Sequence, residues 1–261
     1  MNEVKIALVG NPNCGKTTMF NELTGSNQYV GNWPGVTVEK KEGKLKGSGE
    51  VTITDLPGIY SLSPYTLEEV ISRNYLLDTK LDGILNLVDG SNIERNLYLT
   101  TQLMEMGMPV TIAINMMDIV RKNGDKIDTA ELSKALGCSI VEASALNGEG
   151  TKEAAAKAAD NAGKAAPKPI EFPIEVEEAL TKIHRLMGNR VAGASQRWLL
   201  VKLFERDQEV YKTLKVSEAE QKALDDIIIA CEEQLDDDSE SIITNARYEY
   251  IGQLMSKAVK K

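Results

Sequence analysis

Eight residues near the amino terminus decide the fold: Gly10-Asn11-Pro12-Asn13-Cys14-Gly15-Lys16-Thr17. They match the phosphate-binding loop pattern GxxxxGK(S/T). The apolar run before them, residues 4–9, predicts a short buried strand, and residues 16–24 predict a helix. A strand that leads through such a loop into a helix directs several backbone N–H groups and the positive end of the helix dipole at one point. The stretch therefore predicts a polyphosphate site, whereas a chance glycine-rich turn would lack both flanking elements.

The side chains of this loop have separate expected roles. Lys16 is expected to contact the β and γ phosphates, and the Thr17 hydroxyl is expected to bind Mg²⁺. The Asn13 amide oxygen is a candidate ligand for a monovalent cation that bridges the phosphates, and the alternative is that Asn13 only stabilises the turn. The other residues of the predicted phosphate site are Gly10, Asn11, Pro12, Cys14, Gly15 and Thr18.

The composition is that of an ordinary globular protein. The 261 residues are 42% apolar and 26% charged, enough for one large domain or two smaller ones. The net charge of −9 argues against a nucleic-acid partner, because phosphate backbones are bound by basic surfaces. No apolar stretch approaches the roughly 20 residues of a membrane helix, so we expect a soluble chain. The three cysteines lie far apart, which favours a cytosolic, reducing environment.

Short apolar runs alternate with helical patterns through residue 163. Strands are predicted at 51–54, 83–88, 110–114 and 139–141, and helices at 66–77, 93–106, 129–136 and 149–163. This alternation indicates βαβ units with right-handed crossovers. It predicts an α/β fold in which a mostly parallel sheet carries helices on both faces.

The chain changes character after Ala162. The prolines and small residues of 163–172 predict a linker. Beyond it strand signals disappear, and apolar residues follow helical spacing in four segments: 175–187, 194–205, 217–234 and 239–259. We therefore predict an α/β domain at 1–165 and a small all-helical domain of four or five helices at 166–261.

A second motif, Asp55-Leu56-Pro57-Gly58, directly follows a predicted strand and matches the DxxG element. In phosphate-loop enzymes the aspartate of this element holds Mg²⁺ and the glycine N–H contacts the γ phosphate, so that the turn responds to the presence of that phosphate. An ordinary turn would explain the four residues equally well if they stood alone. Their place after a strand favours the functional interpretation.

A third motif, Asn115-Met116-Met117-Asp118, fits the NxxD signature of guanine recognition. The Asp118 carboxylate can accept hydrogen bonds from N1–H and the N2 amine of guanine, a donor pair that adenine lacks. Met116 replaces the lysine that many GTPases have there, and turn capping is the alternative role for the asparagine and aspartate. A weaker motif, Ser144-Ala145-Leu146, would bring the Ala145 N–H to guanine O6. Four motifs in the expected order predict a P-loop GTPase of the Ras-like type.

The connection between the phosphate loop and Asp55 includes residues 26–39, in which glycine and proline surround a tryptophan. It predicts a long mobile segment, the first switch, rather than a regular element. Thr37, next to Gly35 and Val36, is expected to bind Mg²⁺ through its hydroxyl and the γ phosphate through its backbone. Trp33 is either a core anchor or an exposed hydrophobic residue on the moving loop.

The residue after the DxxG glycine is Ile59, where Ras-like GTPases place the glutamine that orients the attacking water. An aliphatic side chain cannot orient water, so we expect slow unaided turnover. Arg73 and Arg95 are the nearest arginines that could act as a finger in cis. We favour a solvated helix face for both.

Four stretches closely resemble the FeoB family of prokaryotic ferrous iron transporters: 10–17, GNWPGVTVE at 31–39, DLPGIYSL at 55–62 and VDGSNIERNL at 88–97. The helical remainder resembles the spacer domain of that family, which acts like a nucleotide-dissociation inhibitor, in size and position more than in motif. FeoB proteins continue into a polytopic membrane region. The chain therefore resembles the cytoplasmic amino-terminal part.

The resemblance implies a GTPase that regulates Fe²⁺ uptake at the cytoplasmic face of the cell membrane, with fast nucleotide release and slow, K⁺-stimulated hydrolysis. The K⁺-binding asparagine of the family falls on Asn13, and its Mg²⁺-binding switch threonine falls on Thr37. Partners to expect are GTP and GDP, the membrane-embedded remainder, small accessory iron-transport proteins and further copies of the chain. Cys14 stands where the family usually has serine, and its thiol is a candidate for oxidation or alkylation.

Two other functions remain open at this point. A soluble GTPase of ribosome or tRNA maturation would share the loop asparagine and cation dependence, but such proteins usually carry a basic appendage, whereas 174–261 contains acidic runs such as 232–238. A nucleotide-operated binding module, with hydrolysis as a timer, is partly compatible with the first interpretation. Cys138, Cys231 and His184 are expected to be core or surface residues rather than iron ligands.

Overall fold

The computed structural model describes residues 3–26, 28–63 and 66–260, which cluster into two compact units. The second unit comprises Glu105–Gly107 and Pro169–Ile251, and the first comprises the rest of the described chain. In the second unit a Cβ at Gly107 would lie 1.9 Å from the carbonyl oxygen of Ala194, and Gly107 has a φ of 71°. Only glycine therefore fits this position.

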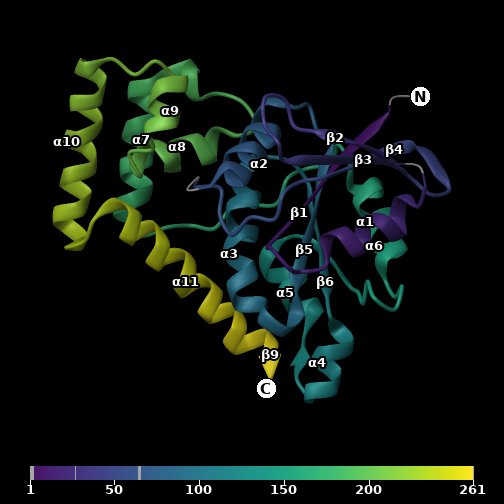
Figure 1. Ribbon diagram of the computed structural model, residues 1–261. Helices are drawn as coiled ribbons and strands as arrows, with labels where there is room; N and C mark the ends of the chain where they lie inside the picture. Colours follow the sequence, from purple (N-terminus) through teal and green to yellow (C-terminus); the bar gives the residue numbers. More distant parts are fainter. Residues whose placement is uncertain (1–2, 27, 64–65, 261) are drawn as a thin grey trace. The chain divides into compact units, whose positions relative to one another are not determined.

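A seven-stranded sheet in the order β2-β3-β4-β1-β5-β6-β8 forms the centre of the first unit (Figure 1). Five of the strands form a parallel sheet in the order β4, β1, β5, β6 and β8, and β3 and β2 extend it with antiparallel pairing. Buried parallel strands are nearly continuous apolar runs, and this is why all five were predicted. The fold class is thus confirmed. The strands are β1 (Val4–Gly10), β2 (Gln28–Asn32), β3 (Glu39–Leu45), β4 (Ser48–Asp55), β5 (Gly83–Asp89), β6 (Val110–Asn115) and β8 (Ser139–Glu142).

Helices cover both faces of this sheet, with α1 and α6 on one side and α2 and α3 on the other (Figure 1). Met19, Phe20 and Leu23 of α1 are fully buried in one cluster with alanines of α6. The predicted helix 93–106 is α3 followed by a 3₁₀ turn at Met104–Met106. The helices are α1 (Lys16–Thr24), α2 (Leu67–Asp78), α3 (Ile93–Leu103), α4 (Met117–Asn123), α5 (Thr129–Leu136) and α6 (Thr151–Asn161).

The expected mobile connection at 26–39 is wrong in part, because Gln28–Asn32 forms β2 and Glu39 begins β3. Residue 27 lies outside the described residues. Between the two strands, the Trp33 N–H donates to the Val38 carbonyl at 2.9 Å and closes the turn. The sequence does not predict β3, because EKKEGKL lacks alternating apolar side chains. Such a polar sequence is typical of a strand near the edge of a sheet.

The carboxyl ends of the parallel strands place the predicted motifs along one edge of the sheet. The phosphate loop follows β1, Asp55 ends β4, Asn115 ends β6, and Ser144 comes two residues after β8. In open α/β sheets ligands bind at this edge, outside the carboxyl ends of the strands. The topology therefore explains why motifs far apart in sequence meet.

The second unit is helical. Its N-caps are well formed: Ser217 and Glu220 make a capping box at the start of α10, and the Asp207 side chain accepts two N–H groups of α9. The helices are α7 (Ile174–Met187), α8 (Gln196–Phe204), α9 (Gln208–Thr213), α10 (Glu218–Leu235) and α11 (Ser239–Ala258), the last of which enters the first unit at Gly252. Within the described ranges, no helix combines the length and apolarity needed to cross a bilayer.

One strand lies within residues 166–261, where the sequence predicted only helices, so the prediction is wrong for this short stretch. β9 (Val259–Lys260) pairs antiparallel with β7 (Lys126–Ile127), and both belong to the first unit. Two residues are too few to show the alternation that identifies a strand.

Candidate functional site

The phosphate loop connects β1 to α1, and two of its glycines are required by geometry. Gly15 has a φ of 95°, and a Cβ there would lie 2.4 Å from Asn115 Nδ2. A Cβ at Gly10 would lie 2.5 Å from the carbonyl oxygen of Leu87. The loop therefore follows a path past β5 and Asn115 that a larger residue would block.

Asn13 also has a left-handed backbone, with a φ of 66°, a conformation that asparagine tolerates better than most residues. Its side chain is exposed, as are those of Thr17 and Thr18 at the start of α1. These three side chains are therefore accessible to a ligand at the loop. Their K⁺ and Mg²⁺ roles remain predictions.

Lys16 and Asp55 approach each other from the first and second motifs. Lys16 Nζ lies 4.0 Å from Asp55 Oδ1, and each side chain is 9% exposed. Burial raises the pKa of the Asp55 carboxyl, and the charge of Lys16 opposes that rise. Asp55 Oδ1 is buried without a hydrogen-bond partner. Because a buried carboxylate oxygen without a donor is costly, this arrangement fits a cation bound beside Asp55.

The DxxG turn is fixed against the phosphate loop. The Leu56 N–H donates to the Leu8 carbonyl at 3.1 Å, and the Ile59 N–H donates to the Gly10 carbonyl at 3.2 Å. A Cβ at Gly58 would lie 3.0 Å from Pro12 Cα, so glycine permits this close approach. The Ile59 side chain is 1% exposed, so it belongs to the core and is unavailable to position water.

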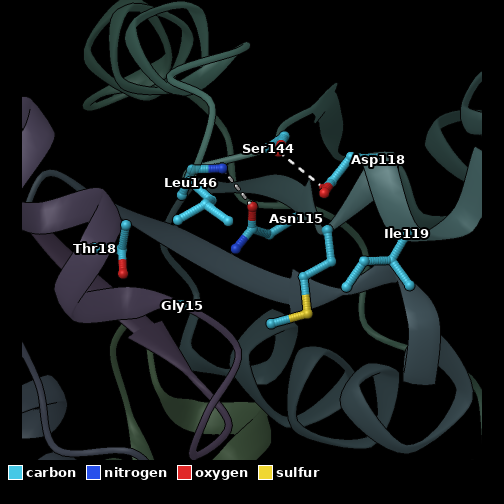
Figure 2. Close-up of a pocket in the computed structure, with 9 residues that line it drawn as sticks. Gly15, Thr18, Asn115, Asp118, Ile119, Ser144 and Leu146 are labelled. Carbon is cyan, nitrogen blue, oxygen red and sulfur yellow. Dashed lines mark hydrogen bonds between the residues drawn. The ribbon is translucent and has the colours of Figure 1, made fainter.

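Asn115 joins the phosphate loop to the fourth motif. Its Nδ2 donates to the Cys14 carbonyl at 2.8 Å. Its Oδ1 accepts the Ala145 N–H at 2.8 Å, a bond drawn as a dashed line in Figure 2. The side chain is 3% exposed. The Ala145 N–H, which we expected at guanine O6, is thus engaged by Asn115 in this structure. Asn115 acts as part of the framework of the site as well as lining it.

Asp118 is held by a short relay of hydrogen bonds. Ser144 Oγ donates to Asp118 Oδ1 at 2.9 Å, as Figure 2 shows, and Asn147 Nδ2 donates to Ser144 Oγ at 3.0 Å. The hydroxyl hydrogen of Ser144 is therefore directed at the carboxylate, which fixes the orientation of that group. Asn147 was not predicted as a site residue, because nothing in its local sequence shows that it would reach Ser144.

A cavity of ≈ 140 Å³ lies between the phosphate loop and the last two motifs (Figure 2). It combines apolar side chains with one carboxylate, which suits a flat base that has a hydrogen-bonding edge. Leu146 is 84% exposed at its rim, and Met116 has a φ of 61°. The sequence interpretation missed Ile119, which lies one residue beyond the NxxD motif. The lining residues are Gly15, Thr18, Asn115, Met116, Asp118, Ile119, Ser144, Ala145 and Leu146.

Trp33 is a core anchor, which settles the choice left open by the sequence. It is 6% exposed, and its ring meets that of Tyr75 edge to face at 5.1 Å between centroids. Lys40 Nζ lies 5.3 Å from the centroid of the indole ring. Thr37 is exposed in the turn that follows Trp33. Among the described residues, no hydrogen bond joins Thr37 to the phosphate loop, so its role remains a prediction.

Cys14 differs from the sequence expectation of a reactive thiol. Its side chain is 1% exposed, and burial raises its pKa to about 11. A buried, protonated thiol is inert towards alkylation and oxidation. The expected sensitivity of Cys14 to oxidation or alkylation is therefore wrong, because the side chain points into the core beneath the loop.

The two candidate arginines behave differently. Arg73 is 5% exposed, so the predicted solvated face is wrong for it, whereas Arg95 is exposed and stacks its guanidinium 4.2 Å from the centre of the Tyr60 ring. His184 is exposed and lies 3.0 Å from the Gln196 amide nitrogen. Within the described residues, no group of three or more histidine, cysteine, aspartate or glutamate side chains is arranged to hold a metal ion.

Two family models match the chain. The model described as ferrous iron transport protein B matches residues 4–158, and the model of the FeoB cytosolic helical domain matches residues 172–260. The Fe(2+) transporter FeoB of Escherichia coli K12 is 39% identical over 97% of this chain and 33% of its own length. An Fe(2+) transport protein A/FeoB fusion protein of Porphyromonas gingivalis is 40% identical over 98% of this chain and 32% of its own length.

Solved structures agree with these matches. A GDP-bound mutant of S. thermophilus NFeoB superimposes with a TM-score of 0.95 at 46% identity, covering 98% of this chain and 100% of the other. NFeoB from S. thermophilus bound to GDP, AlF4⁻ and K⁺ superimposes with a TM-score of 0.90 at 46% identity, covering 97% and 99%. The chain therefore belongs to the FeoB family of ferrous iron transport proteins, and it spans about a third of the length of the curated relatives that it matches.

Proposed function

We propose that this chain binds GTP and GDP and hydrolyses GTP, and that its nucleotide state regulates Fe²⁺ transport by a membrane-embedded remainder. The observation that carries the proposal is the cavity in which Gly15, Asn115, Asp118 and Ser144 meet, although they come from three motifs. A guanine base fits this combination, because the fixed Asp118 carboxylate can accept two hydrogen bonds from it. NFeoB of S. thermophilus, the relative with 46% identity, has been crystallised with GDP.

The phosphates would lie along the loop that precedes α1. Its backbone N–H groups and the amino end of α1 favour negative charge, and Lys16 adds a formal positive charge. Gly58 lies close to Pro12 of the loop, which supports a role in which its N–H would respond to the γ phosphate. Binding and sensing of the triphosphate thus use mainly the backbone.

Two metal ions are part of the proposal. Thr17, Thr37 and Asp55 would hold Mg²⁺, and the orphaned, buried Asp55 oxygen is the feature that fits it. When bound, Mg²⁺ neutralises charge on the phosphate oxygens. Asn13 would hold K⁺ through its exposed amide, in a position to supply the charge of an arginine finger. The K⁺ seen with GDP and AlF4⁻ in S. thermophilus NFeoB supports this assignment.

Hydrolysis should be slow without help. Ile59 is buried in the core, so the attacking water would have to be positioned by backbone groups or by other residues of the switches. Slow hydrolysis favours a domain whose output is a change of conformation, with hydrolysis as a timer. The timer model is therefore part of the proposal and does not compete with it.

The two parts of the chain would have separate tasks. Residues 1–165 would form the GTP-binding domain and 166–261 the helical spacer domain, at the cytoplasmic face of the cell membrane. Small accessory iron-transport proteins and further copies of the chain are proposed partners. The function in ribosome or tRNA maturation is not favoured, because the family models of an iron transporter cover both the nucleotide-binding and the helical regions.

Base specificity gives the sharpest test of this function. Asp118→Asn should reduce GTP affinity and raise affinity for xanthosine triphosphate, whose base presents an oxygen where guanine has its amine. Competition binding with both nucleotides measures the exchange. An unchanged preference for GTP would remove Asp118 from the base site.

The cation is tested separately. Turnover should rise when Na⁺ is replaced by K⁺, and Asn13→Ala should abolish the rise while GDP binding persists. Equal wild-type rates in the two salts would contradict the K⁺ assignment without affecting the guanine assignment.

A further inference from the structure

One buried amide of α3 holds the residues that follow the DxxG turn. Gln102 is 1% exposed, and its Oε1 accepts the Leu62 N–H at 2.7 Å and the Ser61 hydroxyl at 3.2 Å. Its Nε2 also lies 3.1 Å from Ser61 Oγ, to which it can donate. Both ends of the Gln102 side chain are thus committed to this segment.

The start of the same segment is also fixed. The Ile59 N–H donates to the Gly10 carbonyl, and the Ile59 and Leu62 side chains are 1% and 0% exposed. Arg95 stacks on Tyr60 from the surface. Arg95 and Gln102 are seven residues apart, so they lie on one face of α3. Residues 59–62, called the post-DxxG segment below, are therefore held by one helix face and by the phosphate loop.

We propose that Gln102 is a positioning residue for GTP hydrolysis: by holding Leu62 and Ser61, it fixes where the Gly58 N–H stands relative to the γ phosphate. The inference rests on the proposed function. The segment from Gly58 to Leu62 is short, and a Cβ at Gly58 would lie 3.0 Å from Pro12 Cα, so loss of the Gln102 contacts at Leu62 would loosen the DxxG turn against the phosphate loop. Because Ile59 offers no polar side chain to the water, the placement of the backbone around Gly58 matters more for the reaction. Gln102 contributes to that placement through Ser61 and Leu62.

A purely structural role predicts something different. A buried glutamine that served only packing would affect GDP binding and GTP turnover together through loss of folded protein. Gln102 holds the part of the site that meets the γ phosphate, which GDP lacks. Its loss should therefore lower kcat and leave GDP affinity nearly unchanged.

The test compares variants in the full 261-residue chain, with GTP turnover and GDP affinity measured on the same preparations. Gln102→Leu keeps the approximate size and removes every hydrogen bond to the segment. Gln102→Glu keeps an acceptor for the Leu62 N–H. Ser61→Ala removes the second contact from the segment side without opening the core. Thr100→Val is the matched control, because Thr100 is a buried residue of α3 that donates to Asn86 Oδ1 at 2.6 Å instead.

We expect Gln102→Leu to lower kcat by roughly 10- to 100-fold with GDP affinity within about twofold of wild type, as misplacement of a catalytic group does. Gln102→Glu should recover part of that loss, and Thr100→Val should leave kcat within about twofold. Should Gln102→Leu not fold, a fall in kcat of Ser61→Ala alone would support the inference, and wild-type kcat in Ser61→Ala would overturn it.

Two results would overturn the inference in a folded Gln102→Leu: an unchanged kcat, or equal losses in kcat and GDP affinity. If wild type itself neither binds nor hydrolyses GTP, the proposed function fails and this inference fails with it. The wild-type measurement thus separates the two cases.

Discussion

Asn115→Ala tests whether a motif residue supports the site before any nucleotide arrives. In the structure its side chain bridges the Cys14 carbonyl and the Ala145 N–H, both at 2.8 Å, and it is 3% exposed. A residue that only contacted the base would be dispensable for folding. A residue that satisfies two backbone groups is not.

The size of the effect follows from these two hydrogen bonds. Each backbone group left unpaired costs about 1–3 kcal/mol, and water entering from the adjacent cavity would keep the sum near the lower end, about 2–4 kcal/mol. For a domain of this size, about 2–4 °C of melting temperature corresponds to each kcal/mol, so the shift should be about 4–16 °C. Asn115→Asp is the matched variant, because it keeps the acceptor for Ala145 and loses only the donor to Cys14.

Thermal unfolding followed by circular dichroism, without nucleotide, measures this shift. Asn115→Ala should melt well below wild type, with Asn115→Asp less affected than Asn115→Ala. A melting temperature of Asn115→Ala equal to that of wild type, together with weakened GDP binding, would refute the framework role and leave Asn115 as a base contact only.

Three further predictions concern buried charges and thiols. Because burial raises the pKa of Cys14 to about 11, iodoacetamide at pH 8 should label it only after unfolding, and mass spectrometry that finds it modified in native protein would contradict its burial. Arg247→Met should lower the free energy of unfolding in urea by about 3–5 kcal/mol, since it strands Glu105 in a pair whose side chains are both 0% exposed. Arg190→Met removes one partner of a more exposed ion pair, so it should lower the free energy of unfolding by less than Arg247→Met does. Equal losses in the two variants would contradict this reasoning. Because the pKa of Asp55 is raised in the fold, ionisation of Asp55 destabilises the folded state as pH rises through that pKa. Asp55→Asn should therefore melt above wild type at pH 7 and lose this advantage in acid. A melting temperature of Asp55→Asn below that of wild type at pH 7 would contradict the prediction.

The parallel strands and the motifs at their ends were predictable from the sequence for the same reason. Strands buried on both faces, such as β5 with Gly83–Asp89, are continuous apolar runs, and a residue at the carboxyl end of one strand must lie near those of its neighbours. That argument places Asp55, Asn115 and Ser144 beside the phosphate loop without coordinates. The polar strand β3 gives no such signal, because the charged residues of EKKEGKL belong to a strand outside the parallel core.

What the sequence left undecided depends on contacts between distant residues. The burial of Trp33 rests on Tyr75, and the bond from Asn115 to Cys14 spans 101 residues. The Cys14 thiol was a candidate for oxidation or alkylation, yet its side chain is buried beneath the loop. Gln102 carries no motif, and only the three-dimensional structure shows that it holds Ser61 and Leu62. Residues that position a site are recognised by their partners, which local sequence does not reveal.

Isothermal titration calorimetry tests the central claim most directly, with GDP, GTP and ATP each added to the folded chain in Mg²⁺ and K⁺. The account predicts heat and one site per chain for both guanine nucleotides, and much weaker binding of ATP, because adenine lacks the donors that Asp118 accepts. Absence of heat with GDP and GTP, or equal affinity for ATP, would contradict it.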